Sequence, residues 1–538
     1  MRRRILIPVL AFLSLVACSR KEVIPEEVPV PLTSVSVSVS EVRLKEGESM
    51  TVPFSVQSPE CPFNYTLSSP DCQVFLLKPG GKAPSGYQIT AITAEAVKGS
   101  YAITLTDMGT GEEYDDVVCL AIRERPGSDT YVRSAGFSVR FEKPAPKEPY
   151  LTTGLPVVYV NTENGQGVYS KEEFVPASVS IEGTDKLEGM DAVSCSIRGR
   201  GNTTWYWPKK PYLIKLDKKA SVFGLPKHKR WVLLANFMDR TLMRNLVSMK
   251  VASFTSLAWS PHCVPVELVL NGKHQGNYLL IEQVRVDKNR VNVTEMTPED
   301  NEGEALTGGY LLELDFHFDN EVQWKEHNIP FAVKYPDSED LTAAQLSYIK
   351  QYIADASAAL YGEDFQDPEI GYEAYLDVAS FVDYWIVYEV MGNHELGNPG
   401  SVYFHKDRGG KLVAGPCWDF DWGILSYNTS PHAKTGLINR NAIWYARLFR
   451  DPAFVALVKE RFQELLPQLR TIPAFMDQME ELLEASAALN FKMWNPAQDA
   501  SVNNGNIING DEKMSFNAAV ARIRDIYEER LGIIEKSL

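Results

Sequence analysis

Hydrophobic periodicity changes along this chain, and the change limits the fold to a mixed α and β architecture. From Ser34 to about Pro144, short runs such as Ser34-Val-Ser-Val-Ser-Val-Ser40 alternate in polarity, with Gly, Pro, Ser and Asn between them. After Ile438, apolar residues recur at a spacing near 3.6 residues. Alternation is typical of half-buried strands, and the longer spacing is typical of amphipathic helices. The sequence therefore predicts an immunoglobulin-like β-sandwich over residues 34–145 and an α+β domain over residues 150–538 that ends in helices.

The first 33 residues predict export. Three arginines precede an apolar run from Ile5 to Leu15, which is too short to span a membrane as a stable helix. The run ends in Leu15-Val16-Ala17-Cys18, which resembles the bacterial lipobox; an ordinary signal peptide with an incidental cysteine is the alternative. We expect residues 1–17 to be a cleaved signal peptide, Cys18 to carry a lipid, and residues 18–33 to form a proline-rich tether. This predicts a lipid-anchored cell-envelope protein in the outer or inner membrane, with the outer membrane expected and the face undecided.

A strongly basic segment interrupts an acidic chain. Ten basic residues and one acidic residue lie between Arg198 and Arg230, although the chain has a net charge of −16. Arg198 and Arg200 offer planar bidentate donors, and the glycines beside them allow close approach of the backbone. This favours a phosphate or carboxylate ligand; a solvated basic face above core tryptophans is the alternative. Because the whole chain is acidic, we expect no nucleic-acid partner.

Acidic side chains meet in the second half of the chain. Val378 to Met391 is predicted to be a helix that begins after Asp377, and one of its apolar-face positions is Glu389. A hairpin then runs from Ser401 to Ala414. Since a hairpin brings its two ends together, Glu395 before it and Asp419 after it should lie close. Asp419 and Asp421 supply the hard oxygen ligands that Mg²⁺ prefers; for Asp419, a helix or turn cap after Trp418 is the alternative.

Several ordered motifs lie between residues 150 and 430. They are Arg198-Gly-Arg-Gly-Asn-Thr-Thr-Trp205, Pro208-Lys-Lys-Pro-Tyr-Leu-Ile-Lys-Leu216, Trp231-Val-Leu-Leu-Ala-Asn236, Asn271-Gly-Lys-His-Gln-Gly-Asn-Tyr-Leu-Leu-Ile-Glu282, Gly308-Gly-Tyr-Leu-Leu-Glu-Leu-Asp315 and Gly415-Pro-Cys-Trp-Asp419-Phe-Asp421. Together they resemble the CotH kinase family, named for a bacterial spore-coat protein. The resemblance implies a two-lobed, atypical protein-kinase-like domain with ATP between its lobes, which phosphorylates protein serines.

The resemblance also implies roles for individual residues. Lys215 is similar to the strand lysine that contacts nucleotide phosphates, with a surface lysine as the alternative. The backbone of Glu282 lies where a hinge would meet adenine, and a plain strand-end carboxylate is the alternative. The other implied residues are Arg198, Arg200 and Asn202 for the nucleotide, Asp419, Asp421 and Ser401 for Mg²⁺ or Mn²⁺, and Glu395 with Asn393 for catalysis.

Two substitutions depart from the family pattern. Glu395 stands where the family has an aspartate base, and Ser401 stands where it has a metal-binding asparagine. A longer carboxylate misplaces the base, and a small misplacement can cost about 100-fold in rate. We therefore expect ligand binding with weak or absent phosphoryl transfer. The alternatives are an active kinase, a pseudokinase, a structural envelope protein, and a protein-binding or glycan-binding surface lipoprotein. The last would stack sugars on Trp205, Tyr206, Trp207 and Trp422.

Overall fold

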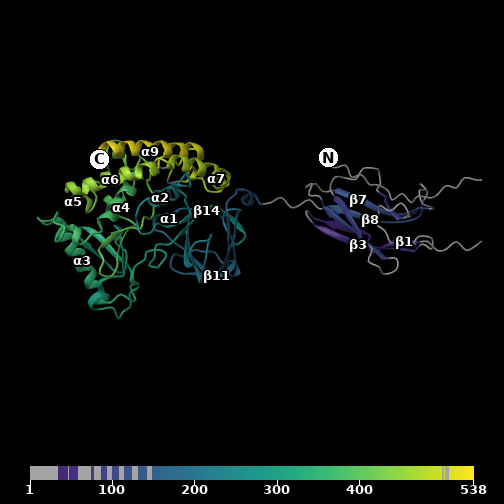
Figure 1. The fold of residues 1–538 in the computed structure, drawn as a ribbon, viewed down its shortest axis with the longest axis horizontal. Helices are drawn as coiled ribbons and strands as arrows, with labels where there is room; N and C mark the ends of the chain where they lie inside the picture. Colours follow the sequence, from purple (N-terminus) through teal and green to yellow (C-terminus); the bar gives the residue numbers. More distant parts are fainter. Residues whose placement is uncertain are drawn as a thin grey trace, which may run out of the picture. The chain divides into compact units, whose positions relative to one another are not determined.

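The computed structural model describes residues 34–45, 48–57, 74–77, 87–93, 100–107, 114–123, 131–141, 148–499, 502 and 508–538. The predicted signal peptide, the lipid-carrying Cys18 and the tether lie outside the described residues. The chain divides into two compact units, Met1–Pro146 and Lys147–Leu538, and each is described by itself (Figure 1).

The described residues of the first unit form two four-stranded sheets. Their strand orders are β1-β3-β6-β5 and β2-β8-β7-β4, and all pairs are antiparallel except β2 with β8. Val42, Leu44, Val52 and Phe137 are buried at 2% exposure or less, as alternating strands require. The β character is as expected, and the immunoglobulin-like arrangement stays a prediction. The strands are β1 (Ser34–Val37), β2 (Glu41–Leu44), β3 (Ser49–Gln57), β4 (Val74–Leu77), β5 (Tyr87–Thr93), β6 (Ser100–Asp107), β7 (Tyr114–Arg123) and β8 (Tyr131–Phe141).

The second unit begins with a closed barrel in the strand order β10-β11-β12-β13-β15-β14-β9. Alternate side chains fill its interior, among them Ile197, Ile214 and Leu233, and each buried aliphatic side chain contributes about 1.5–3 kcal/mol. Asn271 and Gly272 both have positive φ, 51° and 72°, so they form the tight turn that their sequence predicts between β14 and β15. The strands are β9 (Val157–Thr162), β10 (Val175–Glu182), β11 (Met190–Gly199), β12 (Tyr212–Ala220), β13 (His228–Leu234), β14 (Cys263–Leu270) and β15 (Lys273–Glu282).

The barrel is the first lobe of this unit, and the residues that follow it up to the C-terminal helices form the second lobe. A five-stranded sheet in the order β17-β18-β16-β19-β20 forms the centre of this second lobe. Helix α4 begins after Asp377, whose carboxylate accepts the N–H of Ser380 at 2.8 Å, as the sequence predicts. Every residue of α4 from Ser380 to Val390 is buried, because the sheet and later helices surround it. The elements are β16 (Tyr310–Leu314), β17 (Gln323–Glu326), β18 (Ile329–Tyr335), α3 (Ala343–Tyr361), α4 (Val378–Val390), β19 (Val402–Lys406), β20 (Leu412–Ala414) and α5 (Tyr445–Leu448).

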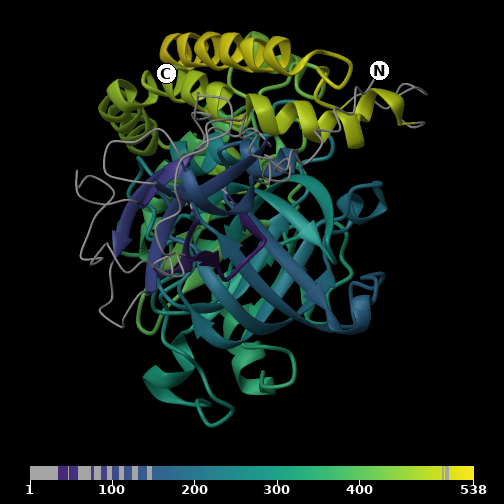
Figure 2. The ribbon, with the colours of Figure 1, turned by 90° about the vertical axis from the view of Figure 1, so that its right-hand side faces the viewer.

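The C-terminal helices tie the two lobes together. In Figures 1 and 2, α7 and α9 run side by side along one face of this unit. Asn490 on α7 accepts the backbone N–H of Asn277 on barrel strand β15 at 3.2 Å, and Arg530 on α9 pairs with Glu389 on α4. Among the described residues, no helix is long and apolar enough to cross a membrane. The C-terminal helices are α6 (Pro452–Leu469), α7 (Ile472–Met493) and α9 (Phe516–Ser537).

One predicted helix begins later than its pattern indicates. The residues from Met238 to Asn245, with Asp239 as a candidate N-cap, predict the start of a helix that runs to about Ser253, whereas α2 spans Arg244–Ala252. The prediction is wrong there because Leu242 has φ of 57°, which no helix accommodates. The N-cap of α2 is Met243 rather than the predicted Asp239, although the Asp239 carboxylate accepts the N–H groups of Thr241 and Arg244 at 3.0 and 2.9 Å.

Candidate functional site

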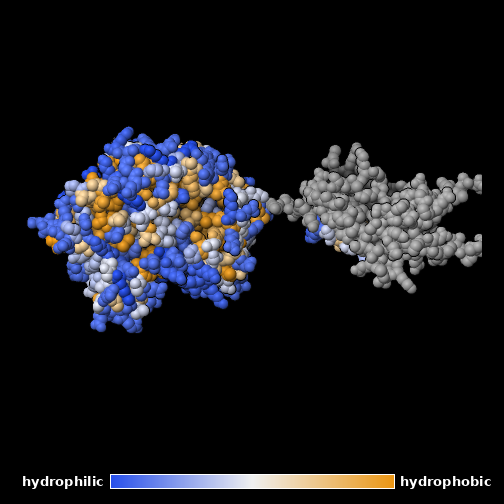
Figure 3. Space-filling model, viewed as in Figure 1, coloured by the Kyte–Doolittle hydropathy of each residue, from blue (hydrophilic) through white to orange (hydrophobic). Residues whose placement is uncertain are grey.

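A cavity of about 740 Å³ lies between the barrel and the second lobe. The surface of this unit is also notched between the barrel and the lobe that carries α3 (Figure 3). Most of its basic side chains come from the barrel side and most of its acidic ones from the second lobe, with Glu172 and Lys334 among the exceptions, so we call the two sides the basic wall and the acidic wall. The predicted site residues that line it are Arg198, Arg200, Asn202, Glu395, Ser401, Asp419 and Asp421.

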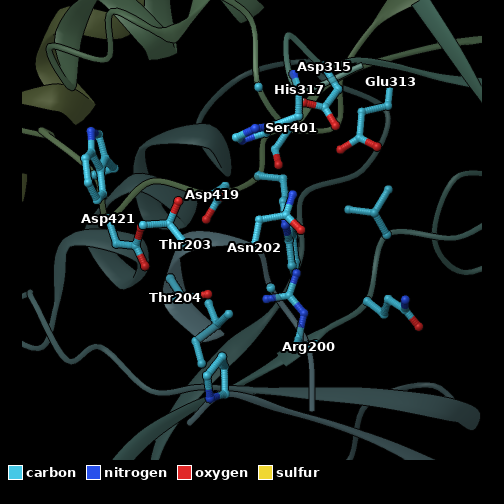
Figure 4. Close-up of a pocket in the computed structure, with 18 of the residues that line it drawn as sticks. Arg200, Asn202, Thr203, Thr204, Glu313, Asp315, His317, Ser401, Asp419 and Asp421 are labelled. Atoms are coloured by element: carbon cyan, nitrogen blue, oxygen red, sulfur yellow. The ribbon is translucent and has the colours of Figure 1, made fainter. Parts of the chain in front are cut away.

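Two aspartates define the acidic wall. Asp419 lies in the loop after β20 with a φ of 65°, and its carboxylate faces the Ser401 hydroxyl (Figure 4). Burial raises the pKa of Asp419, although the positive charge of Arg200 and the Ser401 hydrogen bond lower it. Burial and the neighbouring charge of Asp419 raise the pKa of Asp421. Two crowded, desolvated carboxylates favour a cation between them.

Glu395 completes this acidic group. It follows α4 in a short turn, and its backbone N–H donates to the Asn393 side chain at 2.9 Å. Its Oε2 atom is buried and has no hydrogen-bond partner among the described residues. Burial, and then the charges of Asp419 and Asp421, raise the pKa of Glu395 well above its usual range. The structure thus brings Glu395 and Asp419 together, as the hairpin predicts, whereas Asn393 is fully buried behind Glu395 and does not line the cavity.

The basic wall comes from β11 and the turn after it. Arg200 points into the cavity with its guanidinium 5.5 Å from the ring centroid of Trp418 (Figure 4). Burial lowers the pKa of Arg198, and its Nε atom is buried without a partner among the described residues. The sequence predicts that the glycines beside the arginines allow a ligand to approach the backbone, and for Gly199 this needs correction. A Cβ atom on Gly199 would lie 2.2 Å from the Trp205 ring, so the absence of a side chain makes room for that ring rather than for a ligand.

Two predicted nucleotide contacts lie outside the cavity. Lys215 is exposed on the outer face of β12, because its neighbours Ile214 and Leu216 point into the barrel. Glu282 is buried, and its carboxylate and backbone N–H both bind His262, at 2.9 and 3.1 Å. The residues that follow it, from Gln283 to Val286, line the cavity instead.

Lys209 lines the cavity, although its spacing in the sequence does not single it out. It is 1% exposed, and its ammonium group donates to the Asn277 carbonyl and to the Asn490 side chain, the latter at 2.8 Å. Burial lowers its pKa to about 7, and the charge of Glu267 only partly offsets this effect. Lys209 therefore supplies a weak positive charge at the barrel end of the cavity.

Glu313 and Asp315 also line the cavity, although the sequence did not predict them as site residues. Glu313 pairs with Lys334 at 3.0 Å and accepts the Tyr403 hydroxyl at 2.9 Å. Asp315 accepts the backbone N–H of His317 at 3.0 Å. The available signal was an acid inside the apolar strand β16, where a carboxylate needs partners.

The donor set of the cavity fits Mg²⁺ or Mn²⁺ with a phosphate ligand. In the part of the chain that the structure describes, no group of three His, Cys, Asp or Glu side chains is arranged to hold a metal alone. Mg²⁺ is commonly held by one or two carboxylates together with water and substrate phosphates. Asp419, Asp421 and the Ser401 hydroxyl match that pattern. The buried Arg198 Nε and Glu395 Oε2 atoms have no hydrogen-bond partner among the described residues, so both are free to bind a ligand.

Comparison with known proteins identifies the family. No curated protein matches this chain. Residues 197–534 match the family model described as CotH kinase protein. The matched region runs from the start of the basic wall through the acidic wall to α9. Because this match covers more than half of the sequence, the chain belongs to the CotH kinase protein family.

Proposed function

We propose that the unit Lys147–Leu538 binds a nucleotide such as ATP together with Mg²⁺ or Mn²⁺ and transfers phosphate weakly to protein serine or threonine. The observation that carries this proposal is the convergence of Glu395, Asp419 and Asp421 opposite Arg200 in one cavity. Buried like charges are costly unless a cation joins them, and the arginines offer donors for a phosphate.

Each wall has its own task in this proposal. Asp419, Asp421 and Ser401 would hold the metal ion, which neutralises charge on the phosphates when bound. Arg198 and Arg200 would orient the phosphates from the barrel side, and Asn202 lies beside them on the cavity wall. Lys209, unlike Lys215, lines the cavity, but its ammonium group is bound to Asn277 and Asn490, so the proposal leaves the phosphates to the two arginines.

Glu395 is the proposed proton acceptor for the attacking hydroxyl. Its free Oε2 atom lies on the cavity side of Asn393, which fixes the backbone of the turn. Transfer is expected to be slow for two reasons. The longer side chain of Glu395 places its oxygen differently from that of an aspartate. Ser401 also offers one hydroxyl oxygen in place of an amide.

The proposed setting is the cell envelope. The predicted lipid on Cys18 would anchor the protein in the outer membrane, with the β-rich first unit as a spacer or a protein-contact module. ATP is scarce outside the cytoplasm, which is a further reason to expect weak transfer. Protein serine or threonine is the proposed acceptor.

A thermal-shift screen tests the binding step. Nucleotides and sugars are added with and without Mg²⁺ or Mn²⁺, and a ligand at 100 times its Kd stabilises the native state by about 2.7 kcal/mol. We expect a shift that needs both nucleotide and metal, and that Asp419→Asn removes. Asp355→Asn, which neutralises an exposed acid on α3, is the matched control and should keep the shift. No shift with any nucleotide at millimolar concentration would contradict the proposal.

Transfer of labelled γ-phosphate tests the chemistry. The assay offers the protein itself and casein-like proteins as acceptors. Glu395→Gln should leave the thermal shift nearly intact and abolish the remaining transfer, because a base contributes in the transition state more than in the ground state. Robust transfer that survives Glu395→Gln would show that another group takes the proton.

Glycan binding is the second candidate. Trp207 and Trp422 both line the cavity, and Trp207 stacks on Phe237 with a centroid distance of 5.7 Å. Aromatic faces at a polar cavity are typical of sugar sites as well as of core packing. A metal-independent shift with sugars but not with nucleotides would favour this function.

A further inference from the structure

A segment close to the C-terminus reaches the acidic wall of the cavity. Residues 508–512 read Ile-Asn-Gly-Asp-Glu, and the first three of them belong to a turn-rich loop that the sequence predicts over residues 503–510. In the structure, Ile508 lines the cavity, and the side chains of Asn509, Asp511 and Glu512 are at most 1% exposed. Polar side chains this deeply buried need specific partners.

The Asn509 amide binds the backbone of the loop that carries the two aspartates. Its Oδ1 atom accepts the N–H of Gly423 at 2.9 Å, and its Nδ2 atom donates to the carbonyl of Asp421 at 3.3 Å. The same Nδ2 atom donates to the carbonyl of Met238 at 3.2 Å, on the barrel side of the site. One side chain thus joins the acidic loop to the barrel-side segment.

Asn509 is itself held rigidly. Glu512 accepts the backbone N–H groups of Ile508, Asn509 and Gly510 at 2.7, 2.6 and 2.9 Å. The Asn509 carbonyl accepts both the Ser426 hydroxyl at 2.8 Å and the guanidinium of Arg522 at 3.0 Å, so it keeps one partner when the other is removed. These bonds fix the position of the amide before any ligand is present.

Helix α2 holds the remaining positions of the same loop. Asn245 accepts the N–H of Phe420 at 2.8 Å, and the Nε atom of Arg244 donates to the carbonyl of Ile424 at 2.7 Å. The guanidinium of Arg244 also pairs with Asp239 and Asp511, and all three side chains are buried. Residues 420–424 are therefore held from behind, by groups from α2 and from the C-terminal segment.

The loop needs this support because its own conformation is irregular. Asp419, Gly423 and Leu425 all have positive φ, at 65°, 71° and 48°. Residues other than glycine adopt such values only when surrounding structure determines them. No strand or helix includes residues 415–430, so side-chain contacts take the place of a regular hydrogen-bond ladder.

We propose that Asn509 is a positioning residue for the metal-binding aspartates: it sets the backbone at Asp421, and through it the geometry in which Asp419 and Asp421 meet a divalent cation. This inference rests on the proposed function. Groups that orient metal ligands typically change metal affinity 10–100-fold when they are lost. Asn509 should therefore control Mn²⁺ affinity although it does not touch the ion.

The test compares full-length wild type with Asn509→Ala and with Ser426→Ala. The Ser426 variant loses a hydrogen bond to the same C-terminal segment but keeps the Asn509 amide on Asp421 and Gly423, so it controls for general loosening. Mn²⁺ alone is titrated and followed by electron paramagnetic resonance. Hydrogen exchange of residues 420–425 is measured in metal-free protein, and urea unfolding records stability. If Asn509→Ala fails to fold, Asn509→Asp, which keeps the acceptor for Gly423 but loses both donations, replaces it.

We expect the Mn²⁺ Kd of the Asn509 variant to rise about 10–100-fold, with that of Ser426→Ala close to wild type. Exchange at Gly423 should be about tenfold faster only in the Asn509 variant, since one hydrogen bond is lost. An unchanged Kd in a folded Asn509 variant, or an equal loss in Ser426→Ala, overturns the inference. If wild type binds no Mn²⁺, the proposed function fails, and exchange at Gly423 decides separately whether Asn509 holds the loop.

Discussion

Arg530→Met is expected to destabilise the second unit strongly, because it leaves a carboxylate buried without its ion pair. Arg530 and Glu389 are both fully buried, and they join α9 to α4. The guanidinium donates to the Glu389 side chain at 2.5 Å and to the carbonyls of Ala433 and Gly436 at 2.6 and 2.8 Å. Removing one partner of such a pair costs about 3–5 kcal/mol. Glu389 keeps two backbone N–H donors, which favours the lower half of that range.

The assay is urea unfolding followed by tryptophan fluorescence. All ten tryptophans belong to the unit Lys147–Leu538, so the signal reports this unit alone. Arg470→Met is the matched control, because Arg470 pairs with Glu535 of α9 at 3.3 Å with both side chains exposed. An exposed pair is worth at most about 1 kcal/mol. Adding Glu389→Gln to Arg530→Met should recover part of the loss.

The pH dependence gives an independent check. Burial already raises the pKa of Glu389 above its usual value of 4.5, and loss of Arg530 should raise it further. A folded-state pKa above that of the unfolded chain means that the folded protein binds the proton more tightly, so stability is lost as pH rises. The variant should therefore be less stable relative to wild type at pH 8 than at pH 5. A cost no greater than that of Arg470→Met, or the opposite pH trend, would refute the reasoning.

Three further predictions concern the basic wall and export. Burial lowers the folded-state pKa of Lys209 to about 7 from 10.5, so between these pH values the unfolded chain binds one more proton than the folded protein, and the free energy of unfolding of the wild type rises with pH by up to about 1.4 kcal/mol per pH unit. Lys209→Met should remove this rise between pH 7 and 9. Urea titrations at several pH values would measure it, with Lys210→Met as the control. Gly199→Ala should cost about 1–3 kcal/mol and weaken nucleotide-dependent thermal shifts, because the new methyl group would displace Trp205; an unchanged Tm would contradict this. Cys18→Ala should release the protein from membranes, and continued membrane partitioning in high salt would exclude the lipid anchor.

Local patterns predicted much of the fold. Three local patterns predict structure that the fold then shows. They are the aspartate before α4, the Asn-Gly turn at residues 271–272 and the 3.6-residue spacing after Ile438. The closure of the barrel is different. It depends on a parallel pairing of β9 with β14, which are about 100 residues apart, and no local pattern encodes such a pairing.

The candidate site was predictable on one wall and less so on the other. Glu395 and Asp419 flank one hairpin, so chain geometry alone brings them together. Lys209 and Lys215 lie in one basic segment, and only the register of β12 decides that Lys215 points outward. The contribution of Asn509 was not predictable, because it depends on the packing of a segment almost 90 residues after Asp421.

The closed barrel also governs how copies of this unit can associate. Its strands pair with neighbours on both sides, so none offers a free row of backbone groups. In the second lobe, the edge strand β20 has three residues, and Leu412 bonds with Tyr375 and Asp377 at 2.8 Å on its outer side. The other edge strand, β17, has four residues and ends in Lys325 and Glu326. Crowded copies of this unit are thereby protected against strand-to-strand aggregation, and any assembly must be built from side-chain contacts.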